Sequence, residues 1–174
     1  NNGGNLPSSA LIKTILINSA NDVGPSKVDF QSGFGSVNGF RAMQTLLNGN
    51  FISGSVIPAQ EATYNLIIPA NTREIKITLA WIDPPAAVNA PKALVNDIDL
   101  ELFYPLTSQT WQPWVLSNFP HRDSLLLPAV RKRDGLNTVE QITIDNPTAG
   151  NYIIKVKGFA LATASQTFHI VWQF

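Results

Sequence analysis

The sequence predicts a mainly β protein, a jelly-roll-like antiparallel β-sandwich preceded by two helices. Apolar residues recur with helical spacing before Gly49 and with a spacing of two after it. Turn-forming pairs such as Asn146-Pro147 separate the alternating segments. Strands with one apolar face bury that face by stacking as two sheets or by closing as a barrel, which favours the sandwich.

The first helix is expected over residues 8–20. Leu11 and Ile15 lie four positions apart, and each is followed by a second apolar residue, so one face of the helix is apolar. Pro7 precedes this segment, and Ser8 or the serine after it supplies a hydroxyl that can accept the free N–H groups of the first turn.

The second helix is expected over residues 38–48, where Phe40, Met43 and Leu47 share a face. Gly49 supplies the stop at its C-terminal end. Two helices make a poor core of their own, so their apolar faces need a cover from elsewhere.

Six strands follow the helices, each with apolar side chains alternating with polar ones, which predicts one buried face and one wet face. They are expected around residues 64–68, 75–81, 98–102, 142–144, 152–156 and 168–172. Two further short strands are expected near residues 53–57 and 114–118. Trp81 and Trp172 fall in phase with the apolar positions of their strands, which places both in the core.

The composition argues against two classes of partner. Twelve Lys and Arg balance twelve Asp and Glu, so no basic field attracts nucleic acid or an anionic membrane. No apolar run reaches the length of a membrane span. Charged residues make up 14% of the chain, a surface style common in secreted proteins, whereas the absence of cysteine fits either redox compartment.

The first part of the chain resembles the last helices of a subtilisin-like serine protease domain. The resemblance is carried by residues 7–20, by the Gly-Phe-Gly-Ser-Val-Asn run at 33–38 and by Ala42, in the order and spacing of that family. It implies that residues 1–48 are the helical tail of a subtilisin-like α/β catalytic domain. The remainder of that domain would then be a partner of this chain.

The second part resembles the C-terminal β-domain of large alkaline subtilases, and more distantly the P-domain of proprotein convertases. The residues that carry this resemblance are 77–85, 94–102, 137–140 and 147–156. It implies that residues 50–174 form a sandwich domain of a secreted or cell-surface endopeptidase, where it stabilises the catalytic domain or positions a protein or peptide substrate.

No catalytic residue is identified in this chain. The family's Gly-Thr-Ser turn around the nucleophile is absent, and neither His121 nor His169 lies in a His-Gly-Thr context. We interpret both as surface histidines. We also expect that the chain requires no cofactor. The parent protein is expected to carry the triad upstream, and the alternative of a structural pseudo-protease stays open.

A calcium site is a second hypothesis. Asp83, Asp97 and Asp99 offer hard oxygen ligands, the last two at positions i and i+2 on one strand face. The alternative is that these carboxylates form the wet face of a strand or accept turn N–H groups. No EF-hand loop is present to complete the coordination of the ion.

Trp111 and Trp114 are candidates for ligand binding. Their rings can stack on sugars or on a peptide, which would make the sandwich a carbohydrate-binding or matrix-binding module. The alternative is that they fold a long loop onto the sandwich.

The helices also predict association. Apolar faces around Leu11, Ile15, Phe40 and Met43 need cover, and uncovered patches of this kind drive self-association. We expect them to pack on the sandwich, on a second copy of the chain, or on the rest of the catalytic domain.

Overall fold

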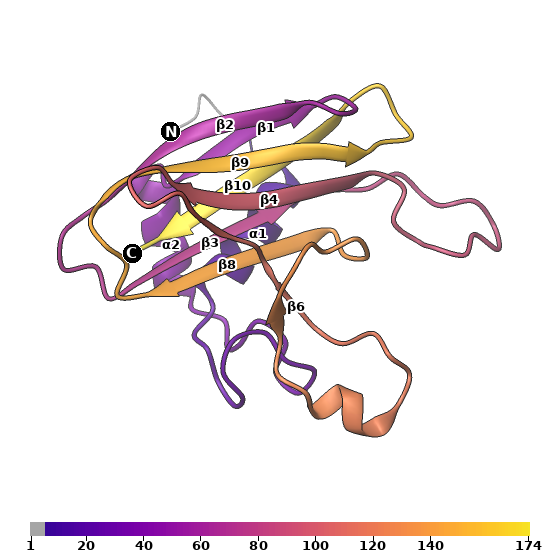
Figure 1. Ribbon diagram of the computed structural model, residues 1–174, viewed down its shortest axis with the longest axis horizontal. Coiled ribbons are helices and arrows are strands. Elements are labelled where there is room, and N and C mark those ends of the chain that lie inside the picture. Colours follow the sequence, from indigo (N-terminus) through magenta and orange to yellow (C-terminus); the bar gives the residue numbers. More distant parts are fainter. Residues whose placement is uncertain (1–5) are drawn as a thin grey trace.

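The computed structural model describes residues 6–174, in which two helices precede two four-stranded antiparallel sheets and one small two-stranded sheet (Figure 1). The elements are α1 (Ser9–Ser19), α2 (Gly39–Asn48), β1 (Phe51–Val56), β2 (Glu61–Ile68), β3 (Glu74–Ala80), β4 (Asp97–Tyr104), β5 (Gln109–Trp111), β6 (Trp114–Val115), the 3-10 helix η1 (Arg122–Leu126), β7 (Val130–Arg131), β8 (Val139–Asp145), β9 (Gly150–Ala160) and β10 (Gln166–Gln173). The predicted mainly β class with two leading helices is confirmed.

The two larger sheets share one hydrophobic core. Their strand orders are β1-β10-β3-β8 and β2-β9-β4-β5. Ile77 and Ile170 of the first sheet belong to the same buried cluster as Leu100 and Ile154 of the second. All six alternating segments of the sequence are strands, because their apolar positions meet in this cluster.

The tryptophans assigned to the core differ in depth. Trp81 is 1% exposed, whereas Trp172 is only partly buried and packs against the edge of the core. Both lie at the positions that the alternation predicted, although β3 ends one residue before Trp81.

The helices cover the outer face of the sheet that contains β10 and β3 (Figure 1). Leu11 and Ile15 of α1 form a second buried cluster with Ala42 of α2 and Val171 of β10. The prediction of one wet face per strand is therefore wrong for β3 and β10, because the helices exclude water from their outward side chains. The sequence left three possible packing partners for Leu11 and Ile15. In the structure these residues pack on the sandwich.

The segment between the helices is held by a close backbone approach at Gly35. Asn21 and Ser36 exchange two backbone hydrogen bonds of 2.8 Å. Gly35 has φ of +104°, and a Cβ at this position would overlap the backbone carbonyl of Asn21. Glycine is therefore required here both for its conformation and for its lack of a side chain.

Three short elements were not predicted: β5, β7 and η1. The expected strand near residues 114–118 is reduced to the two residues of β6, which pairs with β7. The chain between β6 and β7, which contains η1, projects away from the sheets (Figure 1). Within residues 6–174 no helix has the length and apolar character that crossing a membrane requires.

Candidate functional site

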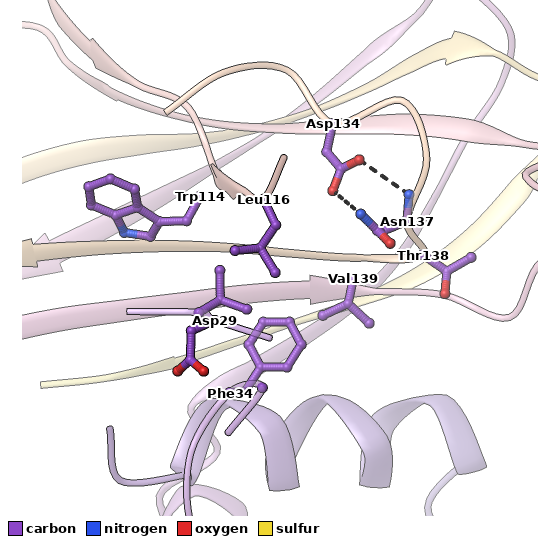
Figure 2. Close-up of a pocket in the computed structure, with 10 residues that line it drawn as sticks. Asp29, Phe34, Trp114, Leu116, Asp134, Asn137, Thr138 and Val139 are labelled. Carbon is purple, nitrogen blue, oxygen red and sulfur yellow. Dashed lines mark hydrogen bonds between the residues drawn. The ribbon is translucent and has the colours of Figure 1, made fainter. Parts of the chain in front are cut away.

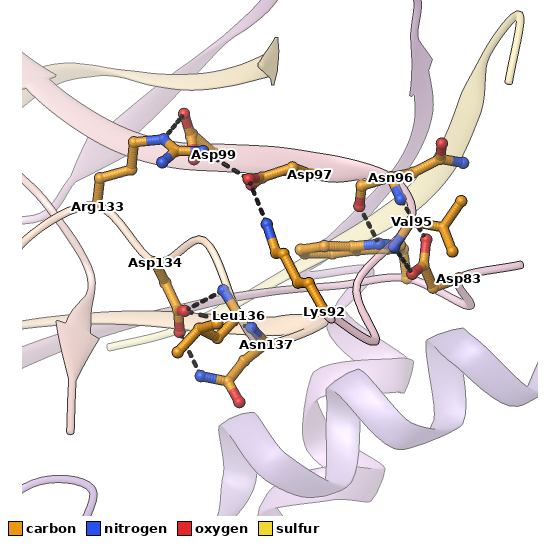
Figure 3. A network of polar contacts seen from close by, with 11 residues as sticks. Asp83, Lys92, Val95, Asn96, Asp97, Asp99, Arg133, Asp134, Leu136 and Asn137 are labelled. Atoms are coloured by element: carbon orange, nitrogen blue, oxygen red, sulfur yellow. Dashed lines mark hydrogen bonds and ion pairs between the residues drawn. The ribbon is translucent and has the colours of Figure 1, made fainter. Parts of the chain in front are cut away.

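A network of polar contacts fixes the start of β4 (Figure 3). The two carboxylate oxygens of Asp83 accept the N–H groups of Val95 at 2.6 Å and Asn96 at 2.8 Å. The indole Nε1 of Trp81 donates to the Asn96 carbonyl at 3.1 Å. Both oxygens of Asp83 are thus used to hold the loop that leads into the strand.

Asp97 and Asp99 both lie on β4, and each faces a positively charged side chain from a loop (Figure 3). Arg133 donates through Nη2 to Asp97 Oδ2 at 2.6 Å and through Nε to Asp99 Oδ2 at 2.9 Å. Lys92 Nζ lies 3.1 Å from the same oxygen of Asp97. Burial raises the pKa of Asp99 above its usual value, although the bond from Arg133 acts in the opposite direction. Arg133 therefore bonds to both carboxylates, and Lys92 supplies a second positive charge beside Asp97.

Glu140 is a buried carboxyl beside this pair. Its side chain is 1% exposed, and Oε2 accepts the N–H of Leu100 at 2.6 Å. Leu100 lies beyond the end of β5, which pairs only with residues 102–104, so Glu140 caps an open stretch of the β4 edge. Burial raises the pKa of Glu140 well above its usual value, and the charges of the neighbouring aspartates raise it further.

The structure separates the three calcium candidates into two groups. Asp83 bonds to backbone N–H groups, while Asp97 and Asp99 bond to Arg133. Among the residues that the structure describes, no group of three or more His, Cys, Asp or Glu side chains is placed to hold a metal ion. The calcium site stays a prediction, and an ion there would compete with Arg133 for the carboxylates.

A pocket of about 290 Å³ lies between the N-terminal segment and the region around β8 (Figure 2). Phe34 lines it from one side, and Trp114, Leu116 and Val139 line it from the other. Asp134 also lines it, but its oxygens accept the N–H of Leu136 at 2.9 Å and the amide of Asn137 at 2.7 Å. Since that carboxylate is engaged in a turn, the pocket offers a mainly apolar surface.

The second acidic side chain of this pocket is Asp29. It accepts the N–H of Gln31 at 2.5 Å and the hydroxyl of Ser32 at 2.5 Å. The bonds from Ser32 lower the pKa of Asp29 below its usual value. This carboxylate is thus also engaged in a turn, and it gives no indication of ligand binding.

Trp111 and Trp114 lie in different places. The ring of Trp114 lies under the guanidinium of Arg131 at 4.1 Å, and its Nε1 donates to Thr143 Oγ1 at 2.8 Å. Trp111 packs against Tyr152 with ring centroids 5.9 Å apart, beside a separate pocket of about 240 Å³. The two rings do not form one stacking platform, and the ligand prediction for them stays a prediction.

The two histidines also have different surroundings. His121 is exposed, and its Nδ1 accepts the N–H of Asp123 at 3.3 Å at the start of η1. His169 lies between the hydroxyls of Ser8 and Ser53, with 2.8 Å from each ring nitrogen to a hydroxyl oxygen. The sequence identified Ser8 only as a candidate helix cap, which the structure confirms, and it did not identify Ser53. The observation that connects Ser53 to His169 is the strand register, which places the two residues opposite each other. The sequence does not show this register, because it depends on the pairing of β1 with β10.

Polar side chains beneath the helices form a further set that the sequence did not identify. Lys76 Nζ donates to the Ala20 carbonyl at 2.8 Å, and Thr78 Oγ1 donates to Asn18 Oδ1 at 2.9 Å. Burial lowers the pKa of Lys76 below its usual value. Outward-facing polar residues of β3 thus bind the C-terminal end of α1 instead of water.

No family model matches the chain. The chain is 26% identical over 177 residues to the Serine protease/ABC transporter B family protein tagA of Dictyostelium discoideum, a match that covers 95% of this chain and 10% of that protein. It is also 32% identical over 82 residues to the Non-reducing polyketide synthase trt4 of Aspergillus terreus (strain NIH 2624 / FGSC A1156), which covers 46% of this chain and 3% of that protein. The chain thus spans a tenth or less of the length of these relatives. The first likeness gives weak support for a relationship to proteases.

Proposed function

We propose that this chain is the C-terminal part of a secreted subtilisin-like serine endopeptidase. Residues 1–48 end the catalytic domain, and residues 50–174 form a sandwich that stabilises this domain or positions its substrate. The parent protein hydrolyses peptide bonds, and its Asp, His and Ser triad lies upstream of this chain.

The observation that carries the proposal is the extent of the likeness to the protein named as a serine protease. The match covers 95% of the chain, so it runs through the helical segment as well as the strands. Two consecutive parts with different periodicities therefore occur together in one relative. This supports the proposal that they are successive parts of one protein.

The contact between helices and sheet supports the stabilising role. Gly49 and Asn50 alone separate α2 from β1. On β10, Gln173 Nε2 donates to the Arg41 carbonyl at 3.1 Å, in addition to the bonds from β3 to α1. A short link combined with a buried polar and apolar contact leaves little freedom between the two parts.

The outward face of α2 supports the proposed partner. Phe40 is 72% exposed and Leu47 is 76% exposed, while Ala42 and Thr45 face inward. Apolar side chains in a row on a helix are typical of a contact surface. We propose that the rest of the catalytic domain covers this row, and self-association of the chain through it is the alternative.

The jelly-roll-like arrangement is part of the same proposal. The strand orders β1-β10-β3-β8 and β2-β9-β4-β5 place sequence neighbours such as β1 and β2 in opposite sheets. Chain crossings between two packed antiparallel sheets are the feature that favours a jelly roll.

The stabilising role is tested on the complete protein. We expect a form that ends after Asn48 to melt several degrees lower than the complete protein, because it loses the sheet on which α1 packs. The matched control is Ile67→Ser in the complete protein, since Ile67 is 73% exposed on β2 in the other sheet. Equal melting temperatures for the truncated and complete forms would contradict the role.

A further inference from the structure

Three side chains from distant parts of the sequence form a chain of hydrogen bonds on the outer face of the first sheet. His169 of β10 lies opposite Ser53 of β1 in the strand register. Its Nδ1 is 2.8 Å from Ser53 Oγ, and its Nε2 is 2.8 Å from Ser8 Oγ at the start of α1. Ser8 and Ser53 are exposed, so small molecules in solvent can reach both hydroxyls.

Two arrangements of the protons fit this hydrogen-bond pattern. Ser8 Oγ accepts the N–H of Leu11 at 3.2 Å, so its own hydrogen is free to point at His169 Nε2. A neutral imidazole with Nε2 as acceptor carries its proton on Nδ1, where Ser53 Oγ accepts it. In either tautomer, one of the two serine hydroxyl hydrogens has no acceptor among the residues described. The network is compatible with the tautomer that has Nε2 as acceptor, and this is the tautomer in which His169 can take the Ser8 proton.

We propose that Ser8 is a nucleophile for small activated esters, with His169 as its general base and Ser53 as the positioning residue. The arrangement has the elements of an activated hydroxyl: a base within hydrogen-bond reach of the nucleophile, and a third group that orients the base. This inference goes beyond the proposed peptidase function and is independent of it, because all three residues belong to this chain.

The reaction is an acyl transfer. Ser8 Oγ attacks the ester carbonyl while His169 Nε2 accepts the hydroxyl proton, and an O–C bond forms. The bond to the leaving group breaks, and the imidazolium returns its proton to the departing oxygen. Water then hydrolyses the acyl-serine and releases the acid. The Leu11 N–H is already used by Ser8 Oγ, which leaves the N–H groups of Ser9 and Ala10 at the start of α1 to favour negative charge developing at this place.

The protonation state of His169 suits this role. Burial lowers the pKa of His169 below its usual value, and no charged side chain contributes to that shift. The imidazole is therefore neutral at neutral pH, as a base must be. His121 provides the matched comparison, since its ring lies 3.7 Å from Asp123 and bonds to no hydroxyl.

The test is the rate at which this 174-residue chain reacts with a fluorophosphonate probe and with p-nitrophenyl acetate. We expect the modification to map to Ser8. We expect Ser8→Asn, which keeps a side-chain cap for α1, to remove the modification, and His169→Ala to slow the reaction by about 100-fold or more. The controls Ser55→Ala and His121→Ala are expected to react as the unchanged chain does, and thermal melting checks that every variant is folded.

The role of Ser53 needs a separate readout. We expect Ser53→Ala to lower the rate by about 10-fold, within the range of general-base effects, and Ser53→Thr to restore it because the hydroxyl returns. The rate of the unchanged chain should rise with pH to a plateau, with its midpoint below the usual pKa of histidine. Modification spread evenly over other serines, or a folded His169→Ala variant with an unchanged rate, would overturn the proposal. Peptide hydrolysis by the complete protein has no bearing on either result.

Discussion

Among single residues, Glu140 couples the stability of the fold to pH. The unfolded chain ionises this carboxyl near pH 4.5, whereas the folded chain keeps it protonated well above that pH, chiefly because it is buried. At pH values between these two pKa values, the folded state therefore binds one more proton at Glu140 than the unfolded state does. The contribution of Glu140 to stability is therefore fully present below pH 4.5 and is lost as the pH rises through the folded pKa.

The variant Glu140→Gln tests this coupling. Glutamine keeps an oxygen that accepts the Leu100 N–H, and it carries no charge to bury. We expect the variant to be more stable than the unchanged chain at about pH 8, by about 1–3 kcal/mol, and nearly equal to it at about pH 4. Urea unfolding at the two pH values measures the difference.

The same variant bears on the calcium prediction. If the predicted calcium site at Asp97 and Asp99 also used the nearby Glu140, which the prediction did not include, the variant would be less stable than the unchanged chain in calcium and nearly equal to it in a chelator. A loss of stability at high pH that appears only with calcium would contradict our interpretation of Glu140 as a neutral cap.

Arg133 is the second residue with a clear expectation. Its guanidinium bonds to Asp97 and Asp99, and it also lies 3.4 Å from the centroid of the Phe159 ring. We expect Arg133→Met to lower the free energy of unfolding by about 1–3 kcal/mol. This is less than a fully buried pair would lose, because the arginine side chain is 36% exposed.

The control for Arg133 is Lys155→Met. Lys155 lies 4.0 Å from Glu61 and 3.9 Å from Glu101, distances typical of weak surface pairs. We expect this change to cost less than about 1 kcal/mol in urea unfolding. Equal losses for the two variants would mean that the contacts of Arg133 contribute no more than an ordinary surface pair.

At the scale of elements, the two helices differ in what their apolar side chains do. In α1, Leu11 and Ile15 are buried on the sheet. In α2 the inward face is made of small residues, and the large apolar side chains point outward. Helix α1 therefore packs on the sheet through large apolar side chains, whereas α2 packs through small residues and leaves its large apolar side chains exposed.

Two substitutions separate these roles. We expect Leu11→Ala to lower the free energy of unfolding by about 2–4 kcal/mol, because Leu11 is 6% exposed and its removal leaves a cavity. We expect Leu47→Ser to change it by no more than about 0.5 kcal/mol, since Leu47 is 76% exposed. A large loss from Leu47→Ser would show that the face is already covered in the isolated chain.

The elements follow from the sequence where a local pattern determines them. The strands that contain Ile77, Leu100 and Ile154 were predicted because alternation reports which side of a strand is buried. Alternation does not report what covers the other side. Lys76 and Thr78 read as wet positions, yet they lie beneath α1, and this contact joins residues more than fifty positions apart.

The candidate sites were harder to predict for the same reason. Asp97 and Asp99 were predicted to lie on one strand, and they do, but their partner Arg133 lies in a loop more than thirty positions away, and no local pattern connects it to them. Ser8, Ser53 and His169 come from a helix start, an edge strand and the last strand. No spacing in the sequence connects them, so their meeting depends on the fold.

At the scale of the whole molecule, the described residues 6–174 pack as two sheets with α1 on one of them, and α2 leaves an apolar row exposed. The two sheets share a core, and α1 is tied to the outer face of one of them by apolar and polar contacts. The exposed large apolar side chains include a row on α2 that contains Phe40, Met43 and Leu47. In the proposed function the rest of the catalytic domain covers this row, and the sandwich packs against the opposite face of the helices.

The peptidase activity of the complete protein tests the central claim most directly. We expect the complete protein to cleave an unfolded protein substrate and to lose this activity when a serine upstream of residue 1, in a Gly-Thr-Ser turn, is replaced by alanine. We expect the isolated 174-residue chain to cleave no peptide bond. A complete protein that is folded but inactive, with no such serine upstream, would contradict the claim.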